Sequence, residues 1–140
     1  MFVLDTNVVS ELMKGHPNPE VLAWLDNQLT DTLFLTAVTE AEIGTGIAIL
    51  PEGERQRGLL VAAERTFGVF FAKRILPFDS EAAQAYAAIA ARRRAAGRPI
   101  SQADCQIAAI ARSRGAAVAT RDTNGFEGCG LDVVNPWSNG

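Results

Sequence analysis

The chain has 140 residues, of which 48% are hydrophobic and 21% are charged, with a formal net charge of −3. This composition is typical of a soluble globular protein, and the length favours one domain over residues 1–140. The charge excludes a broadly basic surface, so a nucleic acid would have to bind along a local basic path.

Membrane and secretory classes are disfavoured by the pattern of apolar residues. No stretch approaches the ~20 apolar residues of a membrane span. The N-terminal segment carries Asp5 and Glu11 where a signal peptide needs a basic start and an apolar run. The two cysteines, Cys105 and Cys129, are too far apart for a Cys-x-x-Cys motif. We therefore expect a cytoplasmic protein with reduced thiols and no membrane contact.

The first half of the chain alternates short apolar strands with helices. A buried strand is predicted at 2–4, followed by a helix that Thr6 or Asn7 caps and that ends near Lys14. Prolines and Gly15 then separate it from a second helix around 21–25. A strand at 32–36 leads into a helix at 37–50, in which Ile43, Ile47 and Leu50 recur at helical spacing.

The second half repeats the alternation. In chain order we predict a helix at 54–71, a strand at 75–78, a helix at 80–96 capped by Ser80, a helix at 101–115 capped by Ser101, and strands at 117–120 and 131–134. The strands are short and apolar, as in a buried parallel sheet. The sequence thus predicts an α/β domain with a central parallel sheet of about five strands and helices on both faces.

Four acidic residues stand at the ends of these elements. Asp5 ends the first strand and Asp122 lies two residues past the fourth, so both should emerge at the same edge of a parallel sheet. Asp104 lies in the first turn of its helix and shares a face with the apolar residues Ile107, Ala108 and Ala111. Glu42 lies beside Ile43 of another apolar stripe. Four carboxylates are therefore expected to meet in one pocket.

Clustered carboxylates repel one another unless a cation joins them. Hard divalent cations such as Mg²⁺ prefer oxygen ligands and bind one or two carboxylates together with substrate phosphates. Such a cation activates water and stabilises the charge that develops on a phosphate during transfer. Hydrolysis of a phosphodiester bond fits this set of residues best.

Each acid also has a purely structural interpretation. Asp5 has the place of a helix cap and Asp122 that of a turn residue. Ser101-x-x-Asp104 and Thr39-x-x-Glu42 have the form of capping boxes. The helix is, however, expected to begin nearer Thr36, which leaves Thr39 inside it. Independent caps have no reason to converge on one edge of a sheet, which favours the functional interpretation.

Basic and aromatic residues suggest where partners bind. Arg121 flanks Asp122 and is the better candidate for a phosphate contact, whereas Arg98 and the run Arg92–Arg94 also suit a solvated helix end. The run Val69–Phe71 is unusually apolar for a helix end and suggests a subunit interface.

Several segments strongly resemble PIN-domain proteins, in family order and nearly end to end. They are Val3-Leu4-Asp5-Thr6-Asn7-Val8-Val9-Ser10-Glu11, Thr39-Glu40-Ala41-Glu42-Ile43 with Gly46, Asp104-x-x-Ile107-Ala108-Ala109, Ala119-Thr120-Arg121-Asp122, and Val133-Val134-Asn135-Pro136-Trp137. The resemblance is closest to the VapC toxins of bacterial toxin–antitoxin pairs, in particular their FitB-like branch.

This resemblance implies a specific function. PIN domains of this kind are Mg²⁺- or Mn²⁺-dependent endoribonucleases. Asp5, Glu42 and Asp104 match the family's metal-binding acids and Asp122 the fourth acidic position, while Thr6, with Asn7 beside it, matches the position that supports the site. Such toxins usually form homodimers and are inhibited by a cognate antitoxin, often a DNA-binding protein, so that DNA is contacted only indirectly.

The chain departs from many relatives near the fourth acid. Those relatives read Thr-x-Asn-x-x-Asp-Phe, with an acid directly before the phenylalanine. This chain has Gly125 before Phe126, and its acid comes earlier, at Asp122. The FitB-like branch shares this arrangement.

Other functions remain as alternatives. A phosphatase or phospho-acceptor domain also places an aspartate after its first strand, but it needs a lysine late in the chain, and the last lysine here is Lys73. A PIN-like binding module with weak catalysis, acting mainly in a DNA-bound complex with its antitoxin, is the second alternative. A Ser-His-Asp triad would have to use the single histidine, His16, in a glycine- and proline-rich loop.

Overall fold

The computed structural model describes residues 1–137, so the last three residues of the predicted 1–140 domain lie outside the described part. Five strands form one parallel sheet in the order β3-β2-β1-β4-β5. The strands are β1 (Phe2–Leu4), β2 (Leu33–Thr36), β3 (Ile75–Leu76), β4 (Ala117–Ala119) and β5 (Val133–Val134). The predicted central sheet of five parallel strands is therefore confirmed.

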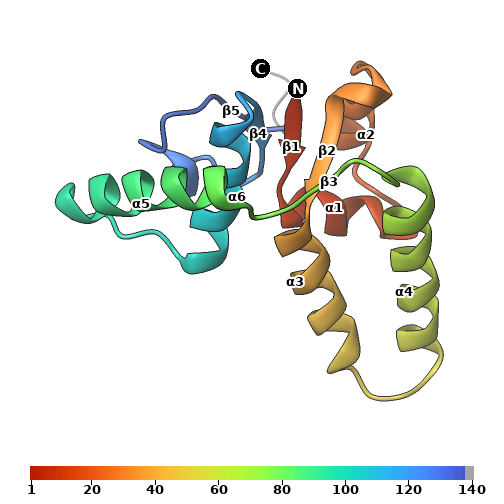
Figure 1. Ribbon diagram of the computed structural model, residues 1–140. Helices are drawn as coiled ribbons and strands as arrows, with labels where there is room; N and C mark the ends of the chain where they lie inside the picture. The colour runs from red at the N-terminus through yellow and green to blue at the C-terminus, as the bar shows by residue number, and fades with distance from the viewer. Residues whose placement is uncertain (138–140) are drawn as a thin grey trace.

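Helices connect the strands. They are α1 (Thr6–Leu12), α2 (Pro19–Asp26), α3 (Ala37–Ala48), α4 (Glu54–Arg65), α5 (Ser80–Ala95) and α6 (Gln102–Ser113). Figure 1 shows α5 and α6 on one side of the sheet and α1, α2 and α4 on the other. This arrangement confirms that helices cover both faces.

The two faces of the sheet carry separate cores because successive residues of a strand point to opposite sides. Val3 of β1 and Val118 of β4 pack against the buried residues of α5 and α6. Their neighbours Leu4 and Ala119 point to the other side of the sheet, where they pack against the apolar residues of α1 and α3. All four of these strand residues are fully buried, which explains why the strands read as continuous apolar runs.

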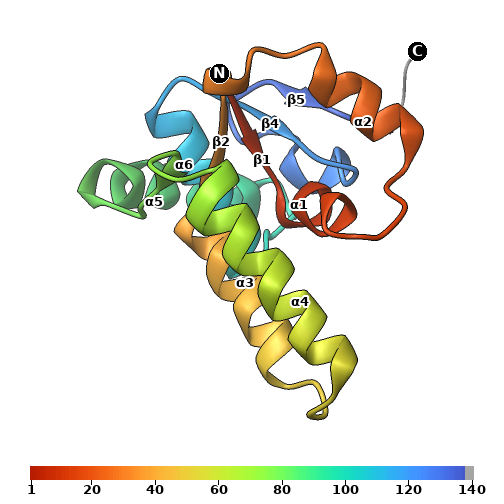
Figure 2. The same cartoon turned by 90° about the vertical axis from the view of Figure 1, so that its right-hand side faces the viewer.

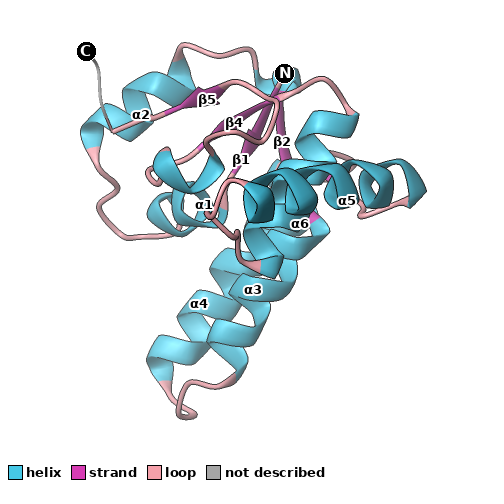
Figure 3. Ribbon diagram, turned by 90° about the vertical axis from the view of Figure 1, so that its left-hand side faces the viewer, coloured by secondary structure: helices cyan, strands magenta, loops and turns pink. Residues whose placement is uncertain are grey.

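Helices α3 and α4 run side by side and project away from the sheet (Figure 2). The same projection is visible from the opposite side in Figure 3, where α3 begins close to α6. None of the helices over residues 1–137 has the length and apolar character needed to cross a membrane.

Strand order reverses at β1. The chain builds β2 and β3 on one side of β1, and then returns to build β4 and β5 on the other. Leu4 is paired with Ala119, and the backbone N–H of Asp5 donates to the carbonyl of Ala119 at 2.9 Å. The switch point, where parallel α/β sheets place their working sites, therefore lies where Asp5 follows β1 and Thr120 follows β4.

Several predicted boundaries were wrong for local reasons. β2 begins at Leu33 because Thr30–Thr32 form a 3₁₀ turn, and β3 ends before Pro77, which has no N–H to donate. β4 and β5 are also shorter than predicted. The predicted helix at 54–71 is α4 followed by a π-helix over Thr66–Phe70.

Two predicted helix caps were also wrong. Asp5, not Thr6 or Asn7, caps α1, and Asp79, not Ser80, caps α5. In both helices the aspartate directly before the predicted cap makes the capping hydrogen bond. The predicted cap of α6 by Ser101 is confirmed, since its hydroxyl accepts from the N–H of Asp104 at 3.2 Å.

Candidate functional site

Asp5 is buried at the switch point, and both of its carboxylate oxygens accept hydrogen bonds. Oδ1 accepts from the backbone N–H of Thr6 at 2.8 Å, which caps α1. Oδ2 accepts from the Thr120 hydroxyl at 2.7 Å and from the Asn7 amide at 3.4 Å. The structural interpretation of Asp5 as a cap is thus confirmed. The second oxygen, however, is held by Thr120, directly after β4, and by Asn7 of α1, and capping does not require these two contacts.

Glu42 lies in the middle of α3, so its predicted place at the end of an element was wrong. It is tied to α1 by a chain of hydroxyl groups. The Thr6 hydroxyl donates to Glu42 Oε1 at 2.7 Å and lies 2.9 Å from the Thr39 hydroxyl. Because the single Thr6 proton is used on Glu42, Thr39 donates to Thr6. Thr36 in turn donates to Thr39 at 3.4 Å.

The start of α3 explains this arrangement. Thr36 caps the helix by accepting from the N–H of Thr39 at 3.1 Å, so the predicted start near Thr36 is confirmed. Thr39 therefore lies inside the helix and cannot form a capping box with Glu42. Thr36 and Thr39 are both completely buried, whereas Glu42 is exposed. The hydroxyl chain thus ends at a carboxylate that faces solvent.

Asp104 lies in the first turn of α6, and its carboxyl group is half-buried. Its backbone N–H donates the capping hydrogen bond to the Ser101 hydroxyl. The predicted place of Asp104 near the helix start is confirmed, and the residues predicted to share its face, Ile107, Ala108 and Ala111, are all buried.

Asp122 follows β4 on an exposed turn. Its backbone N–H donates to the Thr120 hydroxyl at 3.0 Å, and its Oδ1 accepts from the N–H of Gly125 at 3.2 Å. The interpretation of Asp122 as a turn residue is thus also confirmed. Thr120 joins the two strand ends, since the same hydroxyl that accepts from Asp122 donates to Asp5.

The acids influence one another electrostatically. Burial raises the pKa of Asp5 from 3.8 to about 6, and the charges of Asp104 and Glu42 add to the increase, while the hydrogen bonds from Thr120 and Thr6 oppose it. Burial also raises the pKa of Asp104, with contributions from the charges of Asp122 and Glu42, while the hydrogen bond with Ser101 and the charge of Arg93 oppose the increase. All four carboxylates are therefore near enough to act on at least one other member of the set.

The acids do not form a ready-made metal cage. Over residues 1–137, no group of three or more histidine, cysteine or acidic side chains is arranged to hold a metal ion. The donors are carboxylate oxygens that differ in burial, since Asp5 is buried and Asp104 half-buried, whereas Glu42 and Asp122 are exposed.

Glu42 separates two surface cavities. One of about 850 Å³ lies between α3 and the start of α6, lined by Val38, Thr45 and Gln102 among others. The second, of about 360 Å³, lies between α1, α3 and α4 and includes Thr6 and Arg55. Of the four acids, Glu42 therefore borders both cavities.

The arginines considered as substrate contacts have separate surroundings. The Arg121 guanidinium stacks on the Trp137 ring, 5.2 Å from its centroid, and its backbone N–H donates to the Asn7 amide oxygen at 3.3 Å. Arg98 donates to the Asn124 carbonyl at 3.3 Å and pairs with the Glu127 carboxylate at 3.3 Å. Arg121 is exposed beside Asp122, whereas Arg98 is bound to the loop that follows Asp122.

Sequence reasoning missed the buried hydroxyl groups that support the acids. Thr36 and Thr120 end or follow central strands, and Thr39 faces the first helix. The available signal was the presence of a threonine at the carboxyl end of both β2 and β4, which are the two strands that flank the strand ending at Asp5.

Comparisons with known proteins identify the family of the chain. The PIN domain family model matches residues 2–128, so the chain belongs to the PIN domain family.

Three curated relatives are similar over 137 residues, or 98% of this chain. They are the plasmid stability protein StbB of Pseudomonas syringae pv. tomato (48% identical, 99% of its length covered), the VapC ribonuclease Y4jK of Sinorhizobium fredii (47%, 98%) and the toxin FitB of Neisseria gonorrhoeae (42%, 99%). A solved structure of FitAB bound to an IR36 DNA fragment contains a similar chain, with a TM-score of 0.91 and 41% identity, covering 99% of this chain and 96% of that one.

Proposed function

We propose that this PIN domain is a metal-dependent endoribonuclease that hydrolyses RNA phosphodiester bonds at Asp5, Glu42, Asp104 and Asp122. The observation that carries the proposal is the convergence of carboxylates from four separate segments, whose charges add to the increase that burial causes in the pKa of Asp5 and of Asp104. Unpaired acids at the switch point of an α/β sheet destabilise the fold, so a function for them is needed. A relative of nearly equal length carries the name ribonuclease.

Mg²⁺ or Mn²⁺ is the cofactor that suits these donors, since every side-chain donor is an oxygen. Asp5, Glu42 and Asp104 would hold the ion, and Asp122 would complete the site or orient water. When bound, the ion supplies positive charge for the developing phosphate oxyanion and lowers the pKa of water. Thr6 and Asn7 support the site by holding Glu42 and Asp5 in place.

Arg121 is the better candidate for contacting the RNA backbone. It is exposed next to Asp122, and its stacking on Trp137 holds the guanidinium without pairing it with an acid. Arg98 is a weaker candidate, because its guanidinium already pairs with Glu127. Replacement of Arg121 should therefore weaken RNA binding more than replacement of Arg98.

We further infer a role as the toxin of a type II toxin–antitoxin pair in the cytoplasm. The support comes from relatives, one of which is named toxin FitB, while another occurs in a FitAB complex with DNA. The partner would be a cognate antitoxin, and DNA would be contacted only through it. The same FitAB–DNA complex favours the alternative function, a catalytically weak PIN-like module that acts mainly in the DNA-bound complex.

A homodimer is the proposed assembly, formed through the apolar side chains Val69 and Phe70, whereas Phe71 of the predicted interface is buried in the core. Val69 and Phe70 are 67% and 58% exposed on the π-helix, which is costly for a monomer. Phe70→Ser should increase the monomer fraction in gel filtration. Ile49→Ser is the matched control, since Ile49 is 78% exposed at the end of α3 that projects away from the sheet.

Cleavage of a mixed RNA substrate by the purified chain tests the enzyme. We expect cutting with Mn²⁺ or Mg²⁺, none with chelator, and at least a 100-fold loss in Asp5→Asn. Asp31→Asn, on an exposed 3₁₀ turn, is the matched control and should cut normally. Cutting that survives chelation, or a chain that is inert with both metals, would refute the proposal, and the inert result would favour the binding module.

A further inference from the structure

Gly125 occupies a position where space, rather than backbone conformation, requires glycine. It is absent from the glycines with positive φ, so its backbone is accessible to other residues. A Cβ atom added to it would lie 2.4 Å from Asp122 Oδ2 and 2.9 Å from Asp122 Cγ. The Asp122 carboxyl group therefore rests on the bare Cα of Gly125, where any side chain would displace it.

No other glycine of residues 1–137 has this property. An added Cβ meets nothing within 4 Å at most of them. The next closest approach is at Gly130, 3.3 Å from the flexible guanidinium of Arg112. The close approach at Gly125 thus concerns one particular carboxylate, and that carboxylate is the fourth acid of the proposed site.

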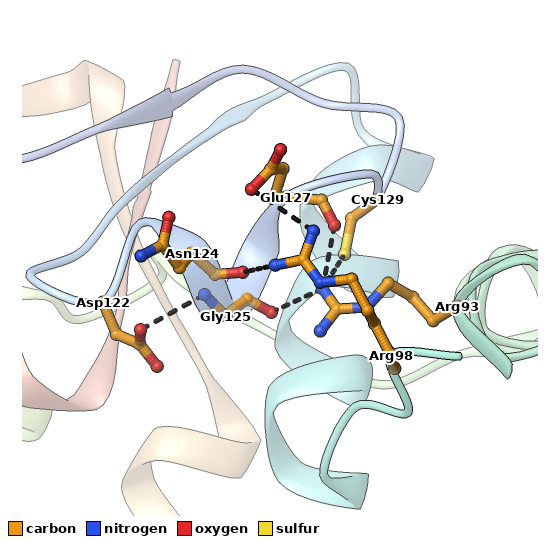
Figure 4. Close-up of polar contacts among 7 residues, drawn as sticks. All are labelled: Arg93, Arg98, Asp122, Asn124, Gly125, Glu127 and Cys129. Carbon is orange, nitrogen blue, oxygen red and sulfur yellow. Dashed lines mark hydrogen bonds and ion pairs between the residues drawn. The ribbon is translucent and has the colours of Figure 1, made fainter. Parts of the chain in front are cut away.

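A buried arginine fixes Gly125 from the opposite side. Arg93 is 7% exposed, and its Nη1 donates to the carbonyls of Gly125 at 2.9 Å and Glu127 at 2.8 Å. Figure 4 shows its guanidinium directed at this loop, with the Asp122 carboxylate on the far side of Gly125. The N–H of Gly125 donates at 3.2 Å both to Asp122 Oδ1 and to the Asp122 backbone carbonyl. Gly125 therefore contacts the buried Arg93 guanidinium through its carbonyl and the exposed Asp122 carboxylate through its N–H.

We propose that Gly125 is a positioning residue that sets the Asp122 carboxylate for cation binding, by donating its N–H and by leaving the space of a side chain empty. Arg93 keeps Gly125 in register for this task. The proposal rests on the function proposed above, because it assumes that Asp122 completes a cation site.

Gly125→Ala tests the proposal, with Gly58→Ala as the matched control. Gly58 lies in α4, and an added Cβ there meets nothing within 4 Å. We expect Gly125→Ala to weaken Mn²⁺ binding in calorimetry by about 10-fold or more, in the range found for lost support of metal ligands. For RNA cleavage, kcat should fall while KM stays unchanged, and Gly58→Ala should match the parent chain in both measurements.

A crystal structure of Gly125→Ala gives a readout that needs neither metal nor RNA. The Asp122 carboxyl group should move away from residue 125, while the loop carbonyls stay on Arg93. An unmoved carboxylate, or Mn²⁺ affinity equal to that of Gly58→Ala, would overturn the proposal. A parent chain that binds Mn²⁺ but cuts no RNA would instead refute the ribonuclease and leave the role of Gly125 to be judged from binding alone.

A relocated carboxylate provides a second test that does not depend on how Gly125→Ala folds. In Asp122→Ala combined with Gly125→Asp, the new side chain starts in the space that the Asp122 carboxylate has left. We expect this double variant to bind Mn²⁺ more tightly than Asp122→Ala alone and to regain part of its cleavage. A double variant no better than Asp122→Ala would show that residue 125 does not share the carboxylate's place.

Discussion

The hydroxyl of Thr39 donates a 2.9 Å hydrogen bond to the hydroxyl of Thr6, 33 residues earlier in the chain. The Thr6 hydroxyl in turn donates to Glu42 Oε1 at 2.7 Å. A completely buried hydroxyl on α3 thus acts, through α1, on a carboxylate one turn further along α3. The orientation of Glu42 is therefore set by the packing of α1 against α3, and not by α3 alone.

Thr39→Val tests whether the hydroxyl of residue 39, and not only the packing of its side chain, orients Glu42. Valine keeps the shape but removes the hydroxyl, which leaves the buried Thr36 hydroxyl proton without an acceptor. We therefore expect a loss of about 1–3 kcal/mol in the free energy of unfolding. Glu42 also loses its fixed direction, so RNA cleavage should fall by about 10-fold. Urea unfolding and cleavage assays measure the two effects. Thr39→Ser restores the hydroxyl, and a serine variant as impaired as the valine variant would contradict the role of the hydrogen bond.

The raised pKa of Asp5 makes the metal-free protein less stable as pH rises. An acid with a pKa of about 6 in the folded chain and 3.8 in the unfolded chain binds its proton more tightly when folded. Its contribution to stability therefore declines from pH 4 upward and levels off above pH 6, a total loss of about 3 kcal/mol.

Urea unfolding of the parent chain and of Asp5→Asn, both in chelator from pH 4 to pH 7, isolates this contribution. The parent should lose stability relative to the variant as pH rises, because asparagine does not titrate. Glu11, whose pKa is lowered by its hydrogen bonds to Lys14 and Asn18, acts in the opposite direction but is common to both proteins. Stability curves that run parallel over this range would show that Asp5 does not carry the raised pKa.

The sequence predicts the fold and the identity of the acids from two independent patterns. Alternating apolar strands and helices determine a parallel sheet, and a residue such as Asp5 directly after a central strand must emerge at its carboxyl edge. The supporting groups are harder to predict. Thr39 and Thr120 act across 33 and 115 residues of separation, which no local pattern encodes.

The short strand β3 and the π-helix before it are likewise hard to predict from sequence. β3 is only two residues long, and the end of the helix that precedes it is a π-helix, so both depend on how the chain packs rather than on local propensity. Gly125 reads as an ordinary turn glycine in sequence, because its contact with Asp122 exists only once the turn has formed.

Asp104→Asn distinguishes a metal ligand from a structural cap. The capping bond of α6 runs from the backbone N–H of residue 104 to the Ser101 hydroxyl, so the substitution leaves it intact. Because burial and the charges of Asp122 and Glu42 raise the pKa of Asp104, removing its charge relieves repulsion in the metal-free chain. At pH 8 in chelator we expect unfolding free energy equal to or above that of the parent, with cleavage abolished. A loss of several kcal/mol on urea unfolding would instead mean that the carboxylate is structural.

Arg93→Met tests whether a buried cation without a carboxylate partner stabilises the loop after β4. Within residues 1–137, Arg93 forms no ion pair, and its guanidinium donates to the carbonyls of Arg98, Gly125 and Glu127. Methionine fills similar space but leaves these carbonyls without donors, so we expect a loss of about 2–4 kcal/mol in urea unfolding. Arg92→Met, at an exposed position of the same helix, should change stability by less than about 0.5 kcal/mol. Equal stability of the two variants would mean that the loop keeps its conformation without Arg93.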